Sequence, residues 1–523
     1  MEEQIRKHER TIIELKRARN ALLNISILPP EVLGDIFRWN VTLEGDFGKL
    51  EEGSRNFLFV CHHWSEVAFH TPEVWSFWGN TPTDWARWYR HSGSAPLDLV
   101  LGDDDCDDNI LDITLRNVIQ DRAARDTIRR VHLRSWDAEL LSSIVFRLSA
   151  ACEGLRSNGV ESFILSNEGD TPVDVSKFFA HYRFPKLQRL GFQKCTITSW
   201  DLLMSRTTVL TSLTLRLSHL SPRPTTSQLL SILASNPSLQ KISLSRFAIP
   251  DDGGGESPCP VSLHRLKELK LSGGLRHVIG LLHRLEHPPN IDLAITLYDR
   301  TAPDIAHIVG PYIRDYLQRR DRSQGGLGLS VIRVGHYTTF RVANMGGIDL
   351  STRVWDRVPP FVSITLGPAQ GSQDISEKGF LDLIPHIPRH EVVSFYSLAD
   401  SAAMEDMSIQ FQNLRALHSC SMSLLAVFPE SNLDGNNWLP PSLQHVVLER
   451  PTVDGGDWSP LTTFLACRAS SGNRLDSLAV VGSHMCPRVE GHVRSMVQEF
   501  RRDCPSQSCP FGTCPLTHIV LVS

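Results

Sequence analysis

Four residues near the C-terminus have side chains that can bind zinc: Cys504, Cys509, Cys514 and His518, with Cys486 somewhat earlier. Thiolate and imidazole groups are the usual zinc ligands, and four of them complete a tetrahedral site. However, four residues separate successive cysteines here, whereas zinc knuckles mostly have two, and a proline follows each of the three clustered cysteines. We therefore favour an irregular loop over a zinc site and expect no metal.

Other groups of polar residues have weaker links to chemistry. The acidic run over residues 102–109 could attract a hard cation, but it lacks the residue order of an EF-hand loop. His62 and His63 are adjacent on a predicted helix, so their side chains point about 100° apart and share no ligand geometry. The glycines at 253–255 lack the Lys-Ser or Lys-Thr of a phosphate loop, and the sequence contains no nucleophile elbow and no His-Glu-x-x-His. We therefore predict no catalytic residues and no cofactor, and expect that the protein is not an enzyme.

The composition is that of a folded protein. Of the 523 residues, 41% are hydrophobic and 21% are charged, and the formal net charge is −5. This charge predicts neither nucleic-acid binding nor a general attraction to anionic membranes. The N-terminus is charged where a secretory signal would be apolar, and no apolar run is long enough to span a membrane. Together with 11 cysteines, mostly scattered singly, these features predict a cytoplasmic or nuclear protein with reduced thiols.

The N-terminal region predicts short helices with more apolar surface than they can bury among themselves. Pro29 and Pro30 suit the first turn of a helix, where backbone N–H groups have no intrahelical partner, and Glu31 lies near the positive end of the helix dipole. Apolar residues follow at helical spacing on this helix and on a second one: Val32, Leu33, Ile36 and Phe37, then Val60, Trp64, Val67 and Ala68. Two helices this short need a partner surface or the rest of the chain. Residues 1–24 predict a solvated helix with a narrow apolar seam, which could pair with another chain or pack back on the helices that follow it.

Three motifs in this region occur in the order of an F-box, at residues 28–37, 60–64 and 71–75. With the charged helix before them and the segments 85–89 and 92–97 after them, the first hundred residues resemble the F-box proteins expanded in mushroom-forming (basidiomycete) fungi. The resemblance implies a helical F-box domain over residues 25–95 that docks a Skp-family adaptor and, through it, a cullin. It also implies these adaptor contacts: Leu28, Pro29, Ile36, Val60 and Trp64. One departure is the segment 43–56, where glycines and charges replace the compact helix usual in the family.

An apolar pattern with the spacing Leu-x-x-Leu-x-Leu recurs through the rest of the chain. Its clearest copies begin at Leu187, Leu210, Leu239 and Leu266, between 23 and 29 residues apart, which is within or near the period of leucine-rich repeats. Weaker copies begin at residues 128, 160, 329, 361, 443, 475 and 516. Stacking such units would bury one continuous core. We therefore predict an α/β fold in which residues 96–523 form a leucine-rich-repeat-like solenoid, with a curved parallel sheet and helical or irregular returns.

The four clearest copies also predict a binding surface. Their second and third apolar residues alternate with polar neighbours, as strands do when they bury one face, so we expect four adjacent parallel strands here. The residue between those two apolar positions must point away from the core. Thr214, Ser243 and Lys270 occupy this position and are predicted to bind a target protein on the concave face. The alternative is a partner on the convex side or on the loop at residues 251–259.

These observations leave three hypotheses for function. The first is the substrate-recognition subunit of a Skp–cullin–F-box ubiquitin ligase, with the repeat region holding an unknown target protein. The second is a repeat scaffold or inhibitor with no ubiquitin-ligase role, whose F-box is vestigial or structural. The third is an α/β enzyme with a doubly wound sheet. It ranks last because such folds usually have a glycine-rich turn after the first strand, whereas the glycines at 253–255 lie in a loop rich in Asp and Pro.

Overall fold

The protein was analysed as a computed structural model with two compact units, Met1–Arg265 and Leu266–Ser523, each described below by itself. The structure describes residues 1–22, 28–43, 52–78, 85–101, 116, 127–152, 159–176, 184–201, 203, 207, 209–217, 222–247, 260–298, 302–320, 326–334, 337–345, 348, 358–366, 383–397, 411–421, 440, 442–452, 458–483, 485, 487–503 and 520–521. Across these residues the fold is α/β, with a large, mostly parallel sheet and 11 α-helices, as the sequence predicts. The division at residue 265 falls inside the region predicted as repeats.

The first unit begins with helices. They are α1 (Glu2–Ala21), α2 (Pro30–Leu43), α3 (His62–Phe69), α4 (Pro72–Trp75) and α5 (Trp85–Ser92), with a 3-10 helix, η2, at Glu52–Phe59. Residues 1–19 of α1 are all exposed, so the predicted apolar seam of this helix is open to solvent. α2 starts at Pro30, as the proline-rich start signal predicts.

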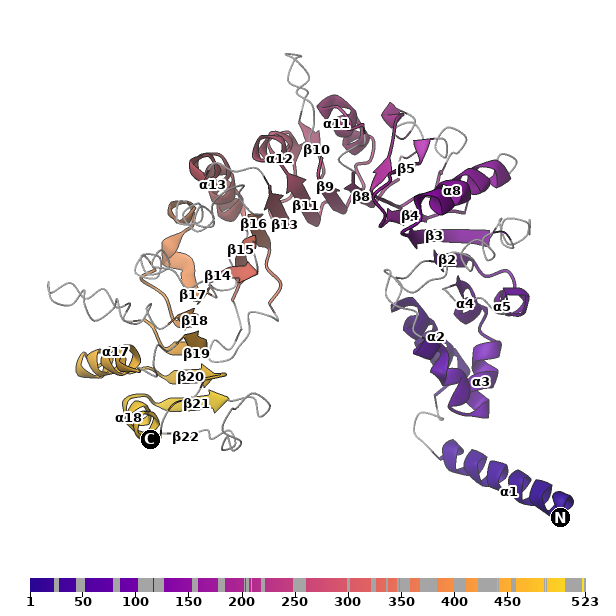
Figure 1. Cartoon of the computed structure of the whole chain (residues 1–523), viewed down its shortest axis with the longest axis horizontal. Helices are drawn as coiled ribbons and strands as arrows, with labels where there is room; N and C mark the ends of the chain where they lie inside the picture. The colour runs from indigo at the N-terminus through magenta and orange to yellow at the C-terminus, as the bar shows by residue number, and fades with distance from the viewer. Residues whose placement is uncertain are drawn as a thin grey trace. The chain divides into compact units, whose positions relative to one another are not determined.

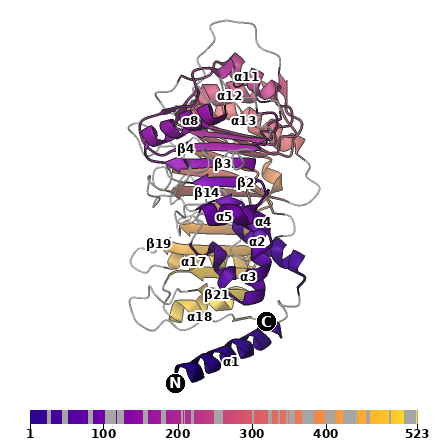
Figure 2. The ribbon, with the colours of Figure 1, turned by 90° about the vertical axis from the view of Figure 1, so that its right-hand side faces the viewer.

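The sheet of the first unit consists of parallel strands in chain order. These strands are β1 (Phe77–Trp78), β2 (Leu97–Leu101), β3 (Ile128–Ser135), β4 (Ser162–Asn167), β6 (Arg189–Gln193), β8 (Ser212–Arg216) and β9 (Lys241–Ser245). Each pairs in parallel with the next, and Figure 2 shows β2, β3 and β4 stacked in this order. The prediction of adjacent parallel strands is confirmed for β6, β8 and β9. Two-residue strands β5 (Val173–Asp174) and β7 (Cys195–Thr196) make a second, parallel pair, and β10 is Val261–Ser262.

Helices cover one face of this sheet. α8 (Ala138–Cys152) and α11 (Thr226–Ala234) lie on the same side of the strands in Figure 1. α11 begins with a capping box, in which the Thr225 hydroxyl accepts from Gln228 N and the Gln228 side chain accepts from Thr225 N, both at 3.1 Å. Alternate strand residues such as Leu213 and Leu215 are buried. The opposite side of these strands is called the open face below.

Asn236 ties the end of α11 to the entry of β8. Its side chain is buried, donates to Ile232 O at 2.9 Å, and accepts from Leu210 N at 3.1 Å. We expect Asn236→Ala to lower the free energy of unfolding by about 1–3 kcal/mol, because it leaves the buried N–H of Leu210 without its partner. Urea unfolding followed by circular dichroism measures this. The control is Ser231→Ala on the exposed side of α11, which should change the unfolding free energy by less than about 0.5 kcal/mol. Equal losses in the two variants would contradict the role given to Asn236.

The second unit contains a longer sheet. Its strands are β11 (Glu268–Gly273), β13 (Asp292–Leu297), β14 (Leu327–Val334), β15 (Tyr337–Asn344), β16 (Val362–Leu366), β17 (Val392–Ser397), β18 (Ala416–Ser421), β19 (His445–Thr452), β20 (Ser477–Val481), β21 (Glu499–Asp503) and β22 (Val520–Leu521), with the short β12 at Leu285–Glu286. Its helices are α12 (Leu275–Leu282), α13 (Ala302–Arg319), α17 (Ser459–Ser470) and α18 (Pro487–Met496), with 3-10 helices η3 (Ile384–His386) and η4 (Arg389–Glu391). Most neighbouring strands are parallel.

Two strands of the second unit contradict an entirely parallel sheet. β15 lies between β14 and β16 and is antiparallel to both. Only two residues separate β14 from β15, and a parallel return needs a connection of a dozen or more residues, so the chain turns back beside β14. This hairpin also places β14 two strands away from β16, so the strand order departs from the chain order. β22 falls in the last predicted copy, yet it is antiparallel to β21.

Candidate functional site

A small aromatic and aliphatic core holds the N-terminal helices together. Leu33, Phe37 and Val41 lie one helical turn apart on α2 and are buried. The Phe37 ring stacks on Phe57 of η2, with centroids 4.5 Å apart. The Trp75 indole N–H of α4 donates to the Ala68 carbonyl at the end of α3, at 2.7 Å. These contacts fix α2, η2, α3 and α4 as one packed module, called the box below.

Large apolar side chains remain exposed on this box. Ile36 is 43% exposed and Trp39 is 59% exposed, while Phe59 and Val60, at the end of η2, are 86% and 52% exposed. Val32, Ile36 and Trp39 follow the i, i+4, i+7 spacing, so α2 has a second apolar stripe beside its buried one. Val32, Ile36, Trp39, Phe59 and Val60 are called the exposed box face. These exposed apolar side chains make the exposed box face a candidate interaction surface.

The predicted adaptor residues separate into two groups. Pro29, Ile36 and Val60 are exposed, as an interaction surface requires. Leu28 and Trp64 are only partly exposed and pack against the box core. The sequence reading missed Trp39 and Phe59 as surface residues. The helical period from Ile36 could have found Trp39, whereas Phe59 lies in a 3-10 turn that no pattern in the sequence indicates.

A groove of about 760 Å³ crosses the open face of the first unit, over β4, β6, β8 and the start of β9. The register of the strands aligns its side chains in three rows. On β6 the three rows contain Arg189, Gly191 and Gln193. The residues of β8 paired with them are, in the same order, Ser212, Thr214 and Arg216. The rows continue on β9 with Lys241, Ser243 and Ser245. On the other side of β6, their members on β4 are Ser162, Ile164 and Ser166. Side chains of one row are therefore neighbours across the sheet.

The middle row forms a low floor. It consists of Ile164, Gly191, Thr214 and Ser243, which are small apart from Ile164. A Cβ atom at Gly191 would lie 3.1 Å from the Ile164 side chain, so the absence of a side chain at 191 leaves room both for Ile164 and for the groove. The outer rows, in contrast, contain long side chains: Arg189 and Lys241 on one side, and Gln193 and Arg216 on the other.

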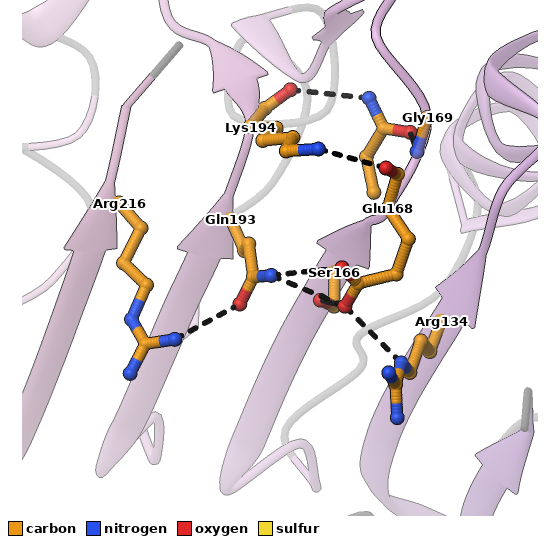
Figure 3. A network of polar contacts seen from close by, with 8 residues as sticks. Arg134, Ser166, Glu168, Gly169, Gln193, Lys194 and Arg216 are labelled. Carbon is orange, nitrogen blue, oxygen red and sulfur yellow. Dashed lines mark hydrogen bonds and ion pairs between the residues drawn. The ribbon is translucent and has the colours of Figure 1, made fainter. Parts of the chain in front are cut away.

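A polar network organises the edge of the groove next to β3 (Figure 3). Glu168 follows β4, and its Oε1 accepts from Arg134 Nε at 3.1 Å, from Ser166 Oγ at 2.9 Å and from Gln193 Nε2 at 3.1 Å. Gln193 Oε1 in turn accepts from Arg216 Nη1 at 3.4 Å. The carboxylate thus aligns side chains from three strands, β3, β4 and β6, and reaches a fourth strand, β8, through Gln193.

A second carboxylate in the sheet of the first unit, Asp98, is neutralised inside the protein. Asp98 of β2 is buried and accepts from Arg129 Nε at 2.9 Å and from Arg129 Nη2 at 2.6 Å. The hydrogen bonds with Asp98 raise the pKa of Arg129, against the opposite effect of its partial burial. Arg130 Nη1 is 3.7 Å from the same carboxylate. Asp98 therefore contributes little negative potential to the open face.

The predicted target-binding residues are only partly brought together. Thr214 and Ser243 are directly paired across β8 and β9, and both are partly exposed between buried neighbours, as the strand alternation predicts. Lys270 is on β11 in the second unit, where it is exposed and forms an ion pair with Glu268. Sequence reasoning missed Arg134, Glu168 and Arg189. The residues two positions before and after Thr214 and Ser243 include Arg216 and Lys241, and the same rule applied to Gly191 would have included Arg189.

One pair of residues on the open face could suggest nucleophilic chemistry. A hydrogen bond of 2.8 Å joins His132 Nε2 and Ser162 Oγ. Both residues are about 1% exposed, so a substrate cannot reach the hydroxyl, and the pair acts as a satisfied polar contact in the sheet. Within the described part of the chain, no group of acidic, His or Cys residues is arranged to hold a metal, and no helix could span a membrane. Cys195, Cys61 and Cys467 have free thiols, and burial raises the pKa of Cys195.

Several sequence predictions fall on residues outside the described ranges. They include the acidic run at 102–109, the loop at 251–259, and the C-terminal cysteines and His518. The zinc question at that cluster therefore stays a prediction. Comparison with models of known protein families finds no match for this chain, and a search of curated proteins finds no similar sequence.

Proposed function

We propose that this chain is the substrate-recognition subunit of a Skp–cullin–F-box ubiquitin ligase. In this proposal the box is the F-box and docks a Skp-family adaptor through the exposed box face. Residues 96–523 act as a leucine-rich-repeat solenoid that holds a target protein, and other subunits carry out ubiquitin transfer. The proposal involves no cofactor, no nucleic acid and no membrane, and places the protein in the cytoplasm or nucleus.

The observation that carries this proposal is the exposed box face. Leu33 and Phe37 complete a packed core, yet Ile36 and Trp39 on the same helix remain in solvent. Burying an apolar side chain stabilises a complex by about 1.5–3 kcal/mol, so a face of this kind favours a protein partner. Val32, Ile36 and Val60 of this face lie within the segments that resemble the F-box motifs, which favours a Skp-family adaptor as that partner. The sequential parallel strands of the first unit, with buried leucines, support the repeat solenoid.

The test is adaptor binding to surface variants. We expect Ile36→Glu combined with Val60→Glu to weaken binding by at least about 100-fold, because interface anchors commonly contribute about 2 kcal/mol or more each. Isothermal titration calorimetry with a purified Skp-family adaptor from a mushroom-forming fungus measures this. Both residues are exposed, so the box should stay folded, and circular dichroism checks this.

Trp136→Glu provides the matched control. Trp136 follows β3 and is 61% exposed, so this variant also removes an exposed apolar residue and adds a charge. It should bind the adaptor with unchanged affinity. If the Ile36→Glu, Val60→Glu variant bound the adaptor like wild type, the assignment of the box as an F-box would be wrong. A chain that captures a cellular protein but never the adaptor would instead favour a scaffold.

A further inference from the structure

We propose that the groove on the open face binds an extended acidic segment of the target protein, with carboxylate or phosphate groups that pair with Arg189 and Arg216. This inference names the chemistry of the target and so rests on the proposed function. It is carried by the charges along the groove, by the alignment of the three rows, and by the network around Glu168.

The groove is strongly cationic in a chain whose net charge is negative. Its lining contains four cationic side chains, Arg134, Arg189, Arg216 and Lys241, and one carboxylate, Glu168. The whole chain has a formal charge of −5. The groove is therefore positively charged although the protein as a whole has a negative net charge. Such local concentration attracts anionic ligands and speeds their association.

The Glu168 carboxylate neutralises only part of the positive charge of the groove. Glu168 pairs with Arg134, and its two oxygens accept from Ser166 and Gln193 as well. Lys194 Nζ donates to the Glu168 backbone carbonyl at 2.8 Å, which places a further positive charge beside it. Arg189, Arg216 and Lys241 are exposed on the adjoining strands. Arg189 and Arg216 are the side chains proposed to pair with an incoming anion, and Lys241 adds positive charge beside them.

The rows fit an extended peptide that runs across the strands. Arg189 and Gln193 are four residues apart on β6, so the two outer rows are separated by about 13 Å. The floor between them is low, because Gly191 has no side chain and Thr214 and Ser243 are small. Successive side chains of an extended peptide point in opposite directions. A peptide above the floor would therefore direct successive acidic groups to Arg189 on one side and to Arg216 on the other.

The chemistry of the rows favours a peptide over a nucleic acid. Single-stranded nucleic acid is usually held by aromatic side chains on which bases stack. From β4 to β9, the three rows contain no Phe, Tyr or Trp, and all of these row residues belong to the described part of the chain. Arginine in such a setting forms two parallel hydrogen bonds with a carboxylate or phosphate group.

The test uses the full-length protein and labelled peptides. The probes are a peptide of consecutive Glu residues, the same peptide with phosphoserine for Glu, and an uncharged peptide in which Gln replaces Glu. Single-stranded oligothymidine is the nucleic-acid probe. We expect both acidic peptides to bind in fluorescence anisotropy and the Gln peptide not to bind. Affinity should fall at least about tenfold between roughly 50 and 200 mM salt, because the exposed charges become screened.

Charge-reversal variants locate the binding surface. Arg189→Glu combined with Arg216→Glu should weaken acidic-peptide binding by at least about 100-fold, since it turns two attractions into repulsions. Arg189→Lys combined with Arg216→Lys keeps the charge and should retain binding within about tenfold of wild type. The matched control, Arg276→Glu with Arg488→Glu, changes the net charge equally at exposed helix positions in the second unit and should bind like wild type.

The outcomes separate this inference from the proposed function. No binding of either acidic peptide, equal loss in the groove and control variants, or tighter binding of oligothymidine would each overturn the acidic-peptide site. Adaptor binding is measured in the same preparations, and the groove variant should retain it. Loss of the peptide site with intact adaptor binding would leave the ligase assignment in place. Peptide binding without any adaptor binding would keep the groove and reject the ligase assignment.

Discussion

Leu213→Asp is expected to destabilise the first unit by about 4 kcal/mol or more. Leu213 is fully buried on β8, between the β6 and β9 strands. A carboxylate at this position has no partner charge in a layer of leucines, so it must either be desolvated or take up a proton. Urea unfolding of the full-length protein, followed by circular dichroism, should show the transition of this unit at a clearly lower urea concentration.

Neighbouring substitutions give the controls for this prediction. Thr214→Asp introduces the same carboxylate one residue later, on the open face, and should cost less than about 1 kcal/mol because the side chain reaches solvent. Leu213→Met conserves volume and should cost less than about 1.5 kcal/mol. If Leu213→Asp and Thr214→Asp unfolded at the same urea concentration, the division of β8 into a buried and an open face would be wrong.

Arg468→Met is expected to destabilise the second unit by about 3 kcal/mol. Arg468 lies on α17 and is 1% exposed, although its side chain is cationic. Its guanidinium donates to the carbonyls of Asn473 at 2.8 Å, Pro440 at 3.2 Å and Leu443 at 2.6 Å. Removing the donors leaves the carbonyls of Asn473 and Leu443 without this partner, at about 1–3 kcal/mol each, whereas the Pro440 carbonyl still accepts from Leu443 N at 3.1 Å. The loss is partly offset because no charge remains buried.

The charge of Arg468 has a cost of its own, since burial lowers its pKa to about 10. Arg468→Lys keeps the charge but cannot reach all three carbonyls in the planar geometry of a guanidinium, so its loss should be close to that of Arg468→Met. Differential scanning calorimetry of the full-length variants compares them. Arg494→Lys on α18, where the side chain pairs with Glu490 nearer the surface, should change the unfolding temperature much less. A gain in stability for Arg468→Met would show that the buried charge costs more than its three contacts contribute.

The strands of the first unit could be predicted because their side chains repeat one pattern. Each clear copy places two leucine-like residues two positions apart, and burial of those positions fixes which face of the strand meets the helices. Two strands of the second unit, β17 and β18, were not predicted for a related reason. They have buried Ser397 and Ser419 where the pattern requires a third apolar residue. β15 belongs to no copy. Its antiparallel direction follows from a two-residue connection, which the repeat period does not reveal.

Less of the candidate site than of the strands could be predicted from the sequence. Glu168 and Gln193 are 25 residues apart along the chain but bonded across β4 and β6, so their contact depends on the register of the strands. In the box, both buried and exposed apolar residues occur at helical spacing, and spacing alone cannot separate Phe37 from Ile36. Packing against Phe57 separates them. Leu28 and Trp64 also contact the core, so substitutions there would loosen the box as well as change its surface.

The central claim is that this chain joins a ubiquitin ligase through its box. The most direct measurement is size-exclusion chromatography with light scattering on a mixture of the full-length protein, a purified Skp-family adaptor and a cullin. The proposed function predicts one peak whose mass corresponds to one copy of each subunit, and loss of this protein from that peak in the Ile36→Glu, Val60→Glu variant. Elution of the wild-type protein alone, beside an intact adaptor–cullin complex, would contradict it.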